Sequence, residues 1–120
     1  MTLTVFSFWN DPEMGTRQSF MDSAKGRSMA GVEQARWDLW GSEAVRRRGA
    51  TFLPRLAQGD LWVENEELDA FEKEVATLMT GLAGLHSELD YRVDMLAHYL
   101  DNFLRASEHA RSMGGGVCIQ

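Results

Sequence analysis

The sequence predicts an α+β fold in which a small sheet, containing strands from both chain ends, packs on a C-terminal antiparallel helical hairpin. Residues 2–9 are rich in β-branched and aromatic side chains, and residues 117–119 form a short apolar segment after three glycines. Between residues 65 and 113, apolar positions recur at steps of three and four, which is typical of amphipathic helices. The 120 residues, 44% hydrophobic and 25% charged, indicate one globular domain spanning residues 1–120.

The first strand has apolar side chains on both of its faces. Leu3 and Val5 point to one side, and Phe6 and Phe8 point to the other, before Asn-Asp-Pro at residues 10–12 indicates a turn. This pattern predicts either a strand that is covered on both sides or a strand whose second face is a contact surface.

The middle of the chain has weaker patterns. We expect a short helix at residues 18–24, a helix at residues 32–40, a further helical turn capped by Ser42, an extended segment at residues 51–53 and a short strand at residues 61–63. Glycines between the first two helices prevent them from forming one longer helix.

The C-terminal half predicts two helices. Asn65 is the expected N-cap of the first helix, and the glycines at positions 81 and 84 mark its end. Ser87 is the expected N-cap of a longer second helix, which carries a leucine-rich stripe almost to the three glycines. Those glycines let the chain turn back, so we expect residues 117–119 to pair beside the first strand.

Charge is distributed unevenly along the chain, whose net charge is −6. Residues 16–55 carry eight basic and four acidic side chains, whereas residues 56–120 carry four basic and twelve acidic ones. Seven of those acids lie within residues 60–74, where Lys73 is the only base. This acidic segment is open to three interpretations: a solvated helix start that complements the helix dipole, internal pairing with the basic segment, or a docking face for a basic partner.

As a docking face, the segment offers an apolar anchor among the carboxylates, because Trp62 lies between acidic residues. The candidate partner-binding residues are Asp60, Trp62, Glu64, Glu66, Glu67 and Asp69.

The second predicted helix offers an alternative site. Asp94, His98 and Asp101 share one polar face, and a carboxylate and an imidazole four residues apart can hold one metal ion. A closed site needs further ligands from a second element, and the same face also fits a solvated surface opposite the apolar stripe.

Several function classes are disfavoured. The acidic net charge argues against nucleic-acid binding, and the arginines at positions 46–48 point in different directions on a helix. The segment 26–31 lacks the second glycine of a Gly-x-Ser-x-Gly nucleophile motif, and the single cysteine, Cys118, cannot form an internal disulfide. Neither a signal peptide nor a membrane-spanning run is apparent, so we expect a cytoplasmic protein that needs no cofactor and contacts no membrane.

The C-terminal segment carries a family resemblance. Phe-Leu-Arg-Ala-Ser-Glu-His-Ala at residues 103–110, followed by Gly-Gly-Gly-Val-Cys-Ile at residues 114–119, resembles bacterial immunity proteins, as do the size and acidity of the chain. The resemblance implies a non-enzymatic inhibitor that binds a bacterial toxin and occludes its active site, often through acidic residues when the toxin is basic. Two alternatives stay open: a small metal-dependent enzyme or ligand-binding protein that uses the polar helix face, and a structural subunit that oligomerises.

Overall fold

The structure is a computed structural model that describes residues 2–120, and it confirms the predicted α+β class. Its five strands form one antiparallel sheet with the order β2-β1-β5-β4, and β3 also pairs with β1. The strands are β1 (Thr2–Asp11), β2 (Thr16–Phe20), β3 (Met29–Val32), β4 (Leu61–Val63) and β5 (Gly116–Ile119).

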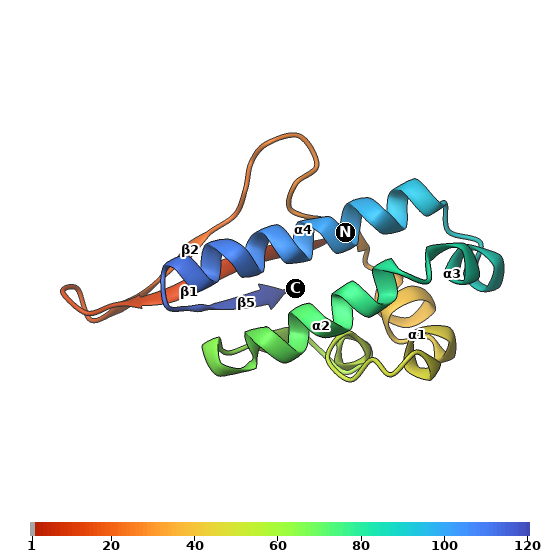
Figure 1. The fold of residues 1–120 in the computed structure, drawn as a ribbon. Coiled ribbons are helices and arrows are strands. Elements are labelled where there is room, and N and C mark those ends of the chain that lie inside the picture. The colour runs from red at the N-terminus through yellow and green to blue at the C-terminus, as the bar shows by residue number, and fades with distance from the viewer. Residues whose placement is uncertain (1) are drawn as a thin grey trace.

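The helices pack together beside this sheet. The α-helices are α1 (Glu43–Arg47), α2 (Leu68–Met79), α3 (Leu82–Leu89) and α4 (Val93–Ser112), and the short η1 (Arg36–Trp40), η2 (Leu53–Ala57) and η3 (Asn65–Glu67) connect them to the strands. The long helix α4 runs along β1 and β5 and contacts α2 (Figure 1). No helix among residues 2–120 is both long enough and apolar enough to cross a bilayer.

Strand β1 organises the sheet because it pairs with three other strands. The terminal strand β5 lies antiparallel to it, with Val5 opposite Ile119 and Phe8 opposite Gly116, which confirms that the chain ends meet. Strand β2 pairs with the second half of β1, and the β1–β2 hairpin projects beyond the helices (Figure 1).

The core lies between the inner face of the sheet and the apolar stripes of α2 and α4. Trp40 is fully buried, its indole N–H donates to the Ala30 carbonyl at 2.8 Å, and its ring packs against Tyr99 and Phe103. Other fully or almost fully buried members of the core are Leu3, Val5, Leu68, Phe71, Val75, Leu78, Leu96, Leu100, Val117 and Ile119. Their spacing agrees with the helical and strand periods seen in the sequence.

The predicted helix at residues 18–24 is wrong, because Thr16–Phe20 forms strand β2. The cause is the preceding turn, where the Asp11 carboxylate accepts the N–H groups of Glu13 and Met14. Gly15 then adopts φ +66°, which glycine reaches without strain, and its N–H donates to the Asp11 carbonyl. The chain therefore folds back on β1 as a hairpin.

Two further predictions in the middle of the chain need correction. The expected helix at residues 32–40 covers only Arg36–Trp40, because Met29–Val32 pairs with β1 as strand β3. The expected extended segment at residues 51–53 is a bend that leads into η2. Here the Glu74 carboxylate of α2 accepts hydrogen bonds from the backbone N–H groups of Thr51, Phe52 and Leu53. These bonds take the place of those that a neighbouring strand would have made to an extended segment.

The predicted helix caps are partly confirmed. Ser42 caps α1, since its Oγ accepts the Val45 N–H at 3.3 Å. Asn65 is not a cap: its side-chain amide donates to the Gly115 carbonyl at 3.0 Å, and Glu64 takes the N-cap position in a capping box with Glu67.

The second predicted helix begins later than expected, after a separate helix that the sequence did not predict. Ser87 is not an N-cap, because it lies inside α3, and Gly84 lies inside α3 as well. The chain breaks at Asp90, which adopts a left-handed φ of 60°, and α4 begins at Val93. The sequence lacks glycine at this break, so its periodicity appeared continuous.

Candidate functional site

The acidic segment is held largely by internal contacts. Asp60 lies 2.8 Å from the guanidinium of Arg36, and Asp69 lies 2.8 Å from Arg111. Glu64 and Glu67 each accept the other's backbone N–H in the capping box. Internal pairing, one of the three interpretations of this segment, thus accounts for much of its charge.

Two further carboxylates of the segment are also engaged. Glu72 contacts Arg111 at 2.7 Å and accepts the Ser107 hydroxyl at 2.5 Å. Glu74 is 9% exposed and holds the bend before η2. Among the residues that the structure describes, no hydrogen bond or ion pair involves the Glu66 carboxylate, so Glu66 presents its charge to solvent.

Trp62 lies at the centre of an aromatic surface on the outer face of the sheet. Leu61 and Val63 are buried on the inner face, so the Trp62 between them points outward, where it is 40% exposed. Its ring centroid lies 6.3 Å from that of Phe6 and 5.2 Å from that of Phe8, both in edge-to-face geometry. We call Phe6, Phe8 and Trp62 the aromatic face.

A cation completes this surface. The Arg17 guanidinium carbon lies 4.8 Å from the Phe8 ring centroid and 5.3 Å from that of Trp62, within the range of cation–π attraction. Arg17 comes from β2, so the hairpin delivers it to the rings. The aromatic face therefore combines the exposed Trp62 ring, the half-buried Phe6 and the buried Phe8 with one positive charge, beside the acidic residues that follow β4.

Small and buried residues beneath the rings fix their position. A Cβ at position 116 would lie 2.1 Å from the Val63 carbonyl oxygen and 2.7 Å from a ring atom of Phe8, so glycine is required where β5 meets β4 and this ring. Cys118 is fully buried, and burial raises the pKa of its thiol to about 12. Cys118 is thus a packing residue under the aromatic face and not a nucleophile at neutral pH.

Part of the aromatic face was visible in the sequence. The apolar side chains on both faces of residues 2–9 predicted either a covered strand or a contact surface, and Phe6 and Phe8 carry that signal. Arg17 was missed, because no strand was predicted between the turn at residues 10–12 and the helix expected at residues 18–24. Its contact with Trp62 depends on the pairing of β2, β1, β5 and β4 across the sheet.

The three candidate metal ligands on α4 are engaged separately. Asp94 pairs with Arg92, His98 Nε2 lies 2.7 Å from the Gly26 carbonyl, and Asp101 lies 2.9 Å from Arg27. Within residues 2–120, no three His, Cys, Asp or Glu side chains cluster in a way that could hold a metal ion. The spacing on one helix therefore does not bring the three groups to a common point.

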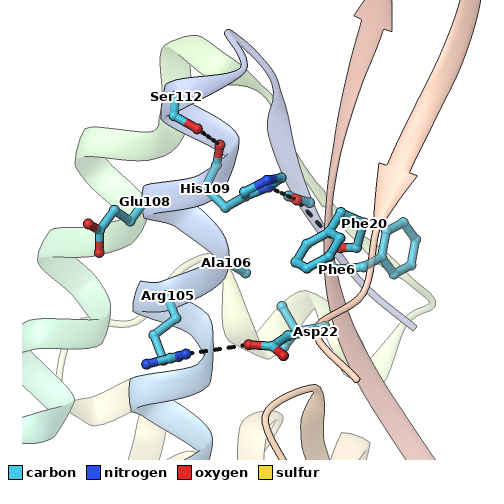
Figure 2. A pocket seen from close by; sticks show the side chains of 10 residues that line it. Phe6, Phe20, Asp22, Arg105, Ala106, Glu108, His109 and Ser112 are labelled. Atoms are coloured by element: carbon cyan, nitrogen blue, oxygen red, sulfur yellow. Dashed lines mark hydrogen bonds and ion pairs between the residues drawn. The ribbon is translucent and has the colours of Figure 1, made fainter. Parts of the chain in front are cut away.

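A cavity of about 480 Å³ lies between α4 and the first two strands (Figure 2). The apolar wall of the cavity is formed by Val5, Phe20 and Ala106. Inside it, Ser7 Oγ lies 2.6 Å from His109 Nδ1, and the imidazole packs between the rings of Phe20 and Trp9 at centroid distances of 4.7 and 5.6 Å. Ser7 is 1% exposed, so its hydroxyl orients the imidazole and is not itself open to a substrate.

The polar groups of the cavity come from distant parts of the chain. Arg105 of α4 lies 3.4 Å from Asp22, which follows β2 (Figure 2). Hydrogen bonds from the Ala24 N–H and the Arg105 guanidinium hold the pKa of Asp22 below its ordinary value, so its carboxylate is charged at neutral pH. Sequence reasoning missed this site, because Ser7 and His109 are 102 positions apart and belong to no local motif.

Comparison of the chain with protein-family models, with curated proteins and with solved structures found no match.

Proposed function

We propose that this protein is a non-enzymatic protein-binding inhibitor that docks on a basic partner through Trp62 and the acidic residues around it. The observation that carries the proposal is the 40% exposed Trp62 on the outer face of the sheet, packed edge-to-face against two phenylalanines. Tryptophan is the residue most enriched at the energetic centres of protein interfaces, because its large ring buries much apolar area at low entropic cost.

Arg17 places one positive charge against the Trp62 ring, whereas the carboxylates that follow β4 favour a basic partner. Glu64 and Glu66 are exposed directly after β4, and Glu66 has no internal cation among the described residues. Carboxylates at the rim of an interface speed the approach of a positively charged surface and select against an acidic one. The aromatic face then supplies the apolar centre of the contact.

The resemblance to bacterial immunity proteins gives the proposal its concrete form. In that form, the partner is a basic toxin, and the sheet face covers its active site. The protein needs no catalytic group for this role, because occlusion depends only on affinity and shape. The contacts of Asp60 and Asp69 with arginines assign these two residues to holding the surface in place, and leave Trp62 and Glu66 as the main contacts.

The test is a binding measurement with the purified product of the adjacent reading frame, since an immunity gene normally lies beside that of its toxin. We expect Trp62→Ala to weaken binding by about 30-fold or more, the effect of losing a central tryptophan. Trp37→Ala is the matched control, because Trp37 is 51% exposed on η1, outside the aromatic face, and its loss should leave the affinity unchanged.

A separate variant tests the contribution of acidic charge to binding. Glu66→Lys reverses a charge without removing a helix cap, whereas reversal of Glu64 or Glu67 would also break the capping box. We expect Glu66→Lys to slow association and added salt to weaken binding of the wild type. Unchanged affinity for both Trp62→Ala and Glu66→Lys in a complex that does form would overturn the proposed docking surface.

A further inference from the structure

The cavity between α4 and the hairpin has properties of a small-molecule site that are independent of the proposed docking surface. Its volume of about 480 Å³ lies within the usual range for ligand pockets, roughly 300–1,000 Å³. Its lining combines aromatic and aliphatic wall with a few polar groups, which is the composition typical of such pockets. Ser7 and His109 lie on the α4 side of the sheet, whereas Phe8 and Trp62 lie on the other.

The hydrogen-bonding state of His109 determines what it offers to a ligand. The buried Ser7 hydroxyl has two acceptors in reach, His109 Nδ1 at 2.6 Å and the Phe20 carbonyl at 3.4 Å. The Ser7 hydroxyl can rotate to either acceptor, and when it donates to Nδ1 the ring proton lies on Nε2. Among the residues that the structure describes, no hydrogen bond involves Nε2, so a ligand carboxylate can select this tautomer and accept from Nε2.

Arg105 adds further donor capacity. Among residues 2–120, its one ion pair is the 3.4 Å approach of Nη2 to Asp22, and its side chain is 50% exposed. The other guanidinium N–H groups are therefore free for a ligand. Both Asp22 oxygens are already used, since Oδ1 accepts the Ala24 N–H and Oδ2 faces Arg105.

Two carboxylates, those of Asp22 and Glu108, belong to the lining of the cavity. Asp22 is offset by Arg105, and Figure 2 shows the Glu108 carboxylate on the side of α4 away from Phe20 and His109. On the side of the cavity away from the Glu108 carboxylate, the unused polar capacity is therefore that of donors, which a ligand carboxylate satisfies best.

We infer that this cavity binds a small aromatic carboxylate. The ligand ring lies against Phe20, Val5 and Ala106, and its carboxylate accepts from His109 Nε2 and from the Arg105 guanidinium. The apolar wall selects the ring by contact area, and the two donors select the anion.

The experiment uses three small probes of nearly equal size: phenylacetate, the uncharged phenylacetamide and the cationic benzylamine. Titration of each into the ¹⁵N-labelled protein is followed by the backbone amide shifts of Asp22, Ala106 and His109. We expect phenylacetate to bind about tenfold more tightly than phenylacetamide, because a charge-assisted hydrogen bond replaces a neutral one. Benzylamine should bind most weakly.

Two variants test the assignment of roles. Arg105→Gln should reduce the affinity for phenylacetate to that for phenylacetamide, while Arg46→Gln, which alters an exposed arginine on α1, should not change it. Ala106→Leu should fill the cavity and abolish the shifts from all three probes. The inference is overturned if no probe shifts these amides, if phenylacetate and phenylacetamide bind equally, or if Arg105→Gln leaves the preference intact.

Discussion

Glu74 provides the sharpest test of how the fold is stabilised. Its carboxylate lies 2.6 Å from the Thr51 nitrogen, 2.9 Å from that of Phe52 and 2.9 Å from that of Leu53. Glu74→Ala leaves these three backbone donors without a partner in a region where Phe52 and Leu53 are buried. The bend between α1 and η2 then loses its hydrogen bonds to α2 and keeps the packing of the Phe52 ring against Phe71.

The magnitude follows from the three hydrogen bonds. An unsatisfied buried donor costs about 1–3 kcal/mol, and partial access of water to the exposed Thr51 lowers the sum. We expect Glu74→Ala to lower the free energy of unfolding by about 3–5 kcal/mol, a large part of the roughly 5–15 kcal/mol of a typical domain. Glu74→Gln keeps one acceptor oxygen and should cost about 2 kcal/mol.

Urea unfolding followed by tryptophan fluorescence measures these changes, because Trp40 is fully buried in the folded state. Glu66→Ala is the control: it removes an exposed glutamate from the same segment and should change stability by less than about 0.5 kcal/mol. A loss below about 1 kcal/mol for Glu74→Ala would show that the three hydrogen bonds do not hold the bend.

Two further predictions concern titratable groups. Burial raises the pKa of Cys118 to about 12, so the native thiol should not react with Ellman's reagent at pH 8 and should react fully after unfolding; rapid native labelling would contradict this burial. Hydrogen bonds from Arg47 and Arg48 hold the pKa of Glu88 below its ordinary 4.5. The contribution of these ion pairs to the stability of the folded state is therefore complete above about pH 4.5, and it is lost as the pH falls through the lower pKa of the folded protein. Calorimetry should show a shallower acid decline of Tm for Glu88→Gln, and an identical decline would contradict the contribution of this ion pair.

The predictable parts of the fold are those that depend on local patterns. The spacing of apolar side chains predicts the strands at both chain ends and the apolar stripes of α2 and α4, and the structure confirms them. The middle of the chain was less predictable, because β2 and η2 depend on Asp11 and Glu74 satisfying particular backbone groups. Such contacts leave no periodic trace in a sequence.

The two candidate surfaces differ in the same way. The sequence predicts Trp62 as the anchor of an acidic face and, separately, leaves Phe6 and Phe8 on a covered strand or a contact surface; the structure joins the three rings. The cavity had no such signal, since His109 and Ser7 meet only when α4 packs on β1. Local spacing likewise grouped Asp94 with His98, although the folded chain gives each a different partner.

The sequence by itself determined the α+β class, the pairing of the chain ends and the concentration of acid in residues 60–74, because these follow from composition and local period. Only the tertiary structure decided which of those acidic side chains have no ion pair within the protein. Arg36 and Arg111 reach Asp60 and Asp69 across the fold, and such long-range pairing depends on how the elements pack and not on the order of residues.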